Sequence, residues 1–109
     1  MASKQAPLHL KASTRRWWAS VCREYALEGH HVRLLTLAAE QWDRCVEARE
    51  RLAADGSYIE DRFHQLKEHP GVKVEHDSAL AFARLLRELD LDVDPPAVEA
   101  RPPQLRRYG

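Results

Sequence analysis

Histidine and acidic side chains are the residues of this 109-residue sequence whose types could bind a metal ion or move protons. Three of its six histidines, His64, His69 and His76, lie near one another in the chain, and Asp77 follows the last of them. No second ligand pair completes the tetrahedral set that zinc prefers. We therefore expect no metal, and we expect His69 to cap a helix instead.

The titratable residues at positions 75–77 do not suggest catalysis either. Glu75, His76 and Asp77 are consecutive, so on a helix they point in different directions and cannot hold one substrate together. The sequence has no glycine-rich phosphate loop and no nucleophile elbow. We expect a protein that is not an enzyme and needs no cofactor.

Basic side chains near the N-terminus are the best candidates for binding phosphate. Lys11, Arg15 and Arg16 form a cluster, with Lys4 ahead of it, and no acid occurs before Glu24. Such a cluster would contact DNA through charge and would not read bases. It is our preferred DNA-binding candidate.

A second basic group lies on the last expected helix, where Lys73, Arg84 and Arg87 share the face opposite the apolar stripe with Leu80. Asp77 and Glu88 border this face. A solvated surface with ion pairs such as Arg84 with Glu88 explains it better than DNA binding does, and we keep both interpretations.

The formal net charge is zero, but the charges are unevenly distributed. Residues 1–16 contain four bases and no acid, whereas residues 17–96 contain sixteen acids and ten bases. The last residues are basic again through Arg101, Arg106 and Arg107, which makes this tail a candidate contact for DNA or for a protein partner.

Three amphipathic helices account for most of the apolar pattern. Apolar residues recur at helical spacing in 15–27, 31–54 and 70–89, and short turns predict that the first two helices form an antiparallel hairpin. Ser13 or Thr14 could cap the first helix, and Gly29 should end it. Pro70 suits the first position of the last helix.

The segments outside these helices have no helical period. Residues 57–68 suit an irregular loop or a very short two-stranded ribbon. The proline-rich end should be disordered or extended. We expect an all-α fold with a mobile basic arm over 1–12, a helical domain over 13–92 and a flexible tail over 93–109.

Large apolar side chains are numerous for so small a core. Trp17, Leu34, Leu37 and Leu80 lie off the main apolar stripes, which suggests a second buried surface between subunits. Cys22 and Cys45 form no Cys-x-x-Cys pair, and no apolar run is long enough to span a bilayer. These features favour a protein of a reducing cytoplasm.

The order of these elements resembles the small terminase subunits of tailed bacteriophages. The resemblance covers roughly residues 8–91: Trp17 and Trp18 in the first helix, Asp55 and Gly56 closing a long second helix, and the segment KEHPGVKV before a helix ending in LLRELDL. It implies a mostly helical ring of identical subunits in the host cell cytoplasm. That ring would bind double-stranded viral DNA and present it to the large terminase subunit, regulating its ATPase and nuclease.

The resemblance does not indicate where DNA would bind, because almost nothing precedes the first helix that could form a helix-turn-helix domain. Two other functions remain open. One is a helical adaptor that binds protein and no nucleic acid, and the other is a small dimeric DNA-binding regulator.

Overall fold

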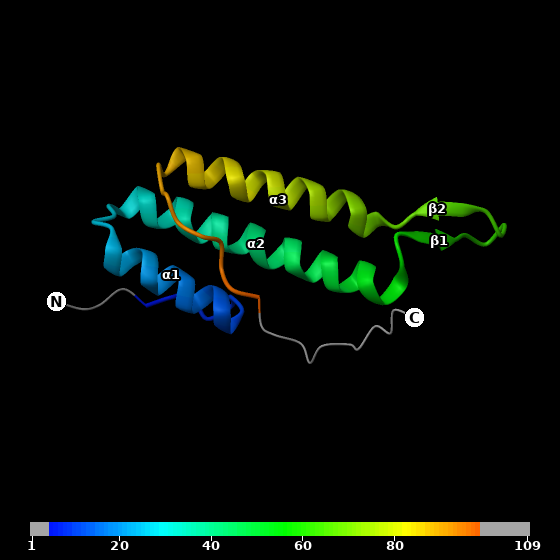
Figure 1. Ribbon diagram of the computed structural model, residues 1–109, viewed down its shortest axis with the longest axis horizontal. Coiled ribbons are helices and arrows are strands. Elements are labelled where there is room, and N and C mark those ends of the chain that lie inside the picture. Colours follow the sequence, from blue (N-terminus) through cyan, green and yellow to red (C-terminus); the bar gives the residue numbers. More distant parts are fainter. Residues whose placement is uncertain (1–4, 99–109) are drawn as a thin grey trace, which may run out of the picture.

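The structure is a computed structural model that describes residues 5–98 and contains three helices joined in part by a short ribbon (Figure 1). The elements in chain order are α1 (Ala12–Glu24), α2 (Gly29–Asp55), β1 (Tyr58–Glu60), β2 (Leu66–Glu68) and α3 (Pro70–Glu88). The predicted all-α class is confirmed, and of the two alternatives for residues 57–68 the two-stranded ribbon is the correct one.

Helix α2 is the central element. The shorter α1 lies antiparallel along the first half of α2, and α3 runs back along its other side (Figure 1). Leu35, Ala38 and Ala39 of α2 are fully buried. Because the two alanines are small, neighbouring helices can approach the α2 backbone closely.

Three aromatic rings, one from each helix, join the bundle together. The Phe82 ring of α3 lies 5.8 Å from the Trp17 ring of α1 and 5.0 Å from the Trp42 ring of α2, measured between ring centroids. Both pairs are tilted, as aromatic rings prefer. Trp17, which the sequence suggested for a subunit interface, therefore packs partly within its own chain, and so does Leu34.

Helix α1 begins and ends three residues earlier than the periodicity predicted. Asp43 of α2 accepts a hydrogen bond from the Lys11 backbone N–H at 2.8 Å. The Thr14 hydroxyl also donates to Asp43, so neither Ser13 nor Thr14 caps the helix as expected. The negative Asp43 carboxylate is also stabilised by the positive end of the α1 dipole, which lies at the N-terminus of that helix.

Gly29 begins α2, whereas the sequence suggested that it ends the first helix. Tyr25 is extended and breaks α1, and the His31 ring then accepts a hydrogen bond from the Glu28 N–H at 3.2 Å. This local contact satisfies one of the free N–H groups at the start of α2.

The expected mobile arm is partly packed. Leu10 is buried in the core shared by α1 and α2, and His9 contacts the Glu40 carboxylate at 2.8 Å. Residues 5–11 therefore lie against the helices. Lys4 lies outside the described residues.

A segment after α3, residues 91–98, crosses the bundle from the end of α3 to α1 (orange in Figure 1), and we call it the C-terminal strap. The Trp17 indole N–H donates to the Asp94 carbonyl at 2.8 Å, and Pro96 is buried. The described part of the expected tail is thus extended and packed. Arg101, Arg106 and Arg107 lie outside the described residues.

Candidate nucleic-acid and subunit interfaces

His69 joins the ribbon to α3 and caps that helix, as the sequence predicted. Its Nδ1 accepts a hydrogen bond from the Gly71 N–H at 2.9 Å, so the neutral ring carries its proton on Nε2, which lies 3.0 Å from an Asp55 carboxylate oxygen. Arg51 contacts the same carboxylate at 3.2 Å. A Cβ atom on Gly71 would come within 3.0 Å of His69 Nδ1, so only glycine fits easily here.

The contacts of Asp55 with His69 and Arg51 make the free energy of unfolding depend on pH in the acid range. The hydrogen bond from His69, with the charge of Arg51, lowers the pKa of Asp55 below its ordinary 3.8. The ionised Asp55 carboxylate therefore stabilises the folded state above its ordinary pKa of 3.8. This contribution is lost as the pH falls through the lower pKa that Asp55 has in the folded state. Asp55→Asn should therefore give a shallower loss of stability below about pH 4 in urea titrations. Asp77→Asn, on exposed α3 surface, is the matched control, and an unchanged acid limb in Asp55→Asn would contradict the assignment.

The ribbon projects beyond the helical bundle (Figure 1), and its large apolar side chains are exposed. Tyr58 is 65%, Phe63 68% and Leu66 76% exposed. Tyr58 pairs with Glu68 and Glu60 pairs with Leu66, so these four residues share one side of the ribbon, which we call the ribbon face. The face combines two apolar side chains with two carboxylates.

A groove of about 470 Å³ lies between α2 and the start of α3, and we call it the α2–α3 groove. It is lined by Arg44, Glu47, Ala48, Arg51, Gly71 and Val74. Among the described residues, the Arg44 guanidinium has no ion-pair partner. Sequence reasoning did not single out these residues, and the apolar Ala48 among charged neighbours, which is buried in the structure, was the one signal of a concave site.

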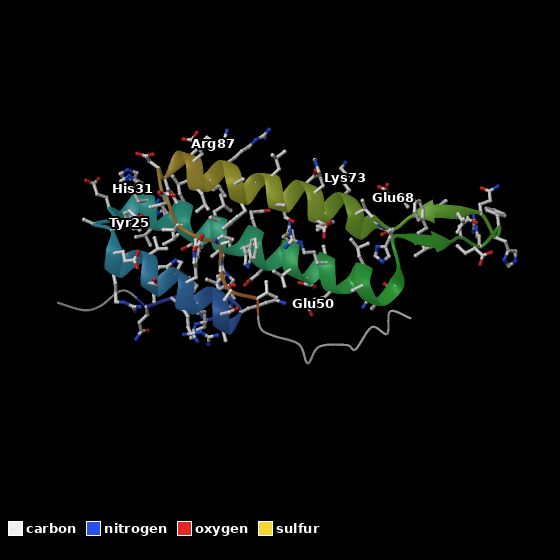
Figure 2. The ribbon with its side chains drawn as sticks, viewed as in Figure 1. Tyr25, His31, Glu50, Glu68, Lys73 and Arg87 are labelled. Atoms are coloured by element: carbon white, nitrogen blue, oxygen red, sulfur yellow. The ribbon has the colours of Figure 1, made fainter. Side chains whose placement is uncertain are left out.

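The outer surface of α3 carries the second predicted basic group. Lys73, Arg84 and Arg87 are exposed around Leu80, which is itself 42% exposed. Figure 2 shows Lys73 and Arg87 pointing away from α2. Within residues 5–98 no ion pair joins Arg84 to Glu88, so the expected neutralisation of this face is weaker than the spacing suggested.

The first predicted basic group is more engaged with its own chain. Lys11 Nζ lies 3.4 Å from the Glu50 carboxylate. Arg15 is half-buried, and its Nε atom is buried. Arg16 is exposed on α1. The structure thus leaves the α3 group more open to solvent than the α1 group.

The four expected interface residues divide into two pairs. Trp17 and Leu34 pack within the chain, whereas Leu37 of α2 is 43% exposed and Leu80 of α3 is 42% exposed. Sequence reasoning missed the ribbon side chains, which are the more exposed ones.

Residues 5–98 offer neither a metal-binding cluster nor a membrane span. No group of three histidine, cysteine or acidic side chains in that range could hold a metal ion. No helix there has both the length and the apolar content needed to cross a bilayer.

Comparison with known families identifies the family of this chain. The model of the family described as "Phage terminase, small subunit" matches residues 11–98. The chain belongs to this family. Small terminase subunits are generally non-catalytic components of phage DNA packaging, and the match extends from the start of α1 through the C-terminal strap. Neither the curated proteins nor the solved structures contain a match.

Proposed function

We propose that this small terminase subunit forms a homo-oligomeric ring that binds double-stranded viral DNA and recruits the large terminase subunit. The family match over residues 11–98 carries this proposal. The ring would hold DNA and its partner in place and regulate the large subunit without chemistry of its own.

DNA contact through the outer surface of α3 suits the geometry. Lys73 and Arg87 are two helical heptads apart, a span of about 21 Å at the standard rise, so they could meet several phosphates. One such surface is weakly charged, because Asp77 lies beside it. A ring repeats the surface in every subunit, and this multivalency would raise the affinity greatly.

Salt dependence tests the DNA contact. The triple variant Lys73→Ala/Arg84→Ala/Arg87→Ala should bind DNA more weakly at all sequences. Its slope of log affinity against log salt should fall by about one for each phosphate that the variant no longer neutralises. Lys11→Ala/Arg15→Ala/Arg16→Ala is the competing variant, and a larger effect there would assign the DNA contact to α1.

Self-association is tested by light scattering on the purified chain. A mass well above that of a dimer is expected for a ring. A stable monomer at high concentration would contradict the proposal, and a dimer that binds DNA would favour a small regulator.

A protein adaptor without nucleic-acid binding is the second candidate, since acids outnumber bases over residues 17–96. DNA retention at low salt separates it from the first. A folded ring that binds the large subunit but never retains DNA would support it.

A further inference from the structure

We propose that the ribbon face of one subunit docks into the α2–α3 groove of the next copy of this chain. The inference rests on the proposed ring and names the two surfaces that would hold it together. Neither surface is covered by the described part of its own chain, residues 5–98.

The ribbon face is a surface that needs cover. An isolated two-stranded ribbon is marginally stable in water, and here each strand has three residues. Tyr58 and Leu66 are largely exposed. Large exposed apolar clusters usually mark interaction sites. The ribbon is held to the helices at its base, where the His69 N–H donates to the Ser57 carbonyl at 2.8 Å.

The groove offers matching chemistry. Val74 is 40% exposed and supplies most of the apolar surface of the groove, since Ala48 is only 7% exposed. Arg44 and Arg51 face the same hollow, with Glu47 as the one acid of its lining. Arg51 is paired with Asp55, so among the described lining residues Arg44 is the cation available to a carboxylate.

The two surfaces are complementary in charge and in polarity. Glu60 and Glu68 of the ribbon face carry negative charge, and Glu68 has no ion-pair partner among the described residues. Tyr58 and Leu66 lie diagonally across the ribbon face and would contact Val74. Opposite charges beside apolar contacts are typical of specific interfaces.

The contact must be made between copies. The groove begins at Gly71, immediately beyond the base of the ribbon, whereas the ribbon extends away from the bundle along its long axis (Figure 1). A ribbon therefore cannot reach the groove of its own chain. Because two different surfaces meet, the contact is head-to-tail, and such contacts close into rings when the rotation allows.

Two variants and their mixture test the proposal. Tyr58→Ser/Leu66→Ser damages the ribbon face, and Arg44→Glu/Val74→Asp damages the groove. Each variant alone should lose the native mass and become a monomer. Mixed in equal amounts they should form a heterodimer of two chains, because one intact ribbon can meet one intact groove.

Leu8→Ser is the matched control, since Leu8 is exposed but belongs to neither surface. It should keep the native mass, and circular dichroism should show all variants helical. Heterodimer formation also demonstrates that both partners are folded.

Four outcomes would overturn the inference. A native ring that survives in both variants, or folded variants that do not pair when mixed, would leave the ring proposal intact and remove this contact. A ribbon variant that keeps the ring but loses the large subunit would assign the ribbon face to that partner. A monomeric native chain would remove both proposals.

Discussion

Replacing Phe82 with alanine should lower the free energy of unfolding by about 3–5 kcal/mol, one of the largest single-residue effects expected for this chain. Phe82 is buried, and its ring contacts both Trp17 and Trp42. The substitution removes apolar contact area and leaves a cavity where the three helices meet. Urea denaturation followed by circular dichroism would measure the loss.

Phe82→Leu is the matched control, since leucine keeps most of the apolar volume and should cost much less. Both variants must be compared at one protein concentration, because the proposed self-association would stabilise the folded state. A loss below about 1 kcal/mol in Phe82→Ala would show that the aromatic cluster is not a tightly packed core.

Asp43→Ala should also have a large effect, about 2–3 kcal/mol, because it removes an acceptor of two hydrogen bonds at the start of α1. The Lys11 N–H and the Thr14 hydroxyl would both lose their partner, and Thr14 is buried. The loss should be local at first. Hydrogen exchange should accelerate in residues 11–16 before it does in α2.

Asp43→Asn tests whether charge or hydrogen bonding matters more. The amide oxygen can still accept from the Lys11 N–H, so Asp43→Asn should retain part of the stability that Asp43→Ala removes. Equal losses in the two variants would mean that the carboxylate acts mainly through its charge on the helix dipole.

Local signals in the sequence were sufficient for α3, whereas for residues 57–68 they left an irregular loop and a ribbon as alternatives. Pro70 fixes a helical backbone angle at the first position, and His69 before it provides a ring nitrogen that accepts from the Gly71 N–H. Apolar residues at helical spacing then give the buried stripe through Phe82. Each of these signals acts within a few residues, so the order of the chain alone reveals them.

Contacts between distant residues were not predictable in this way. Asp43 lies far along the chain from Lys11, and its carboxylate moves the start of α1 to Ala12. The C-terminal strap has no periodicity, and it packs through Leu91 and Val93 against the core and through the hydrogen bond from the Trp17 indole N–H to the Asp94 carbonyl. The α2–α3 groove likewise arises from the meeting of two helices, each of which on its own has the pattern of a solvated surface.

The hydrogen bonds at the base of the ribbon affect how much sequence variation the ribbon can tolerate. His69, Asp55 and Ser57 fix both ends of the ribbon to the helices, and the helices themselves pack without it. Mutations and length changes in residues 58–68 would accordingly be inherited with little penalty to folding. If copies of the chain associate through the ribbon face as proposed, sequence changes in this segment would alter which copies recognise one another.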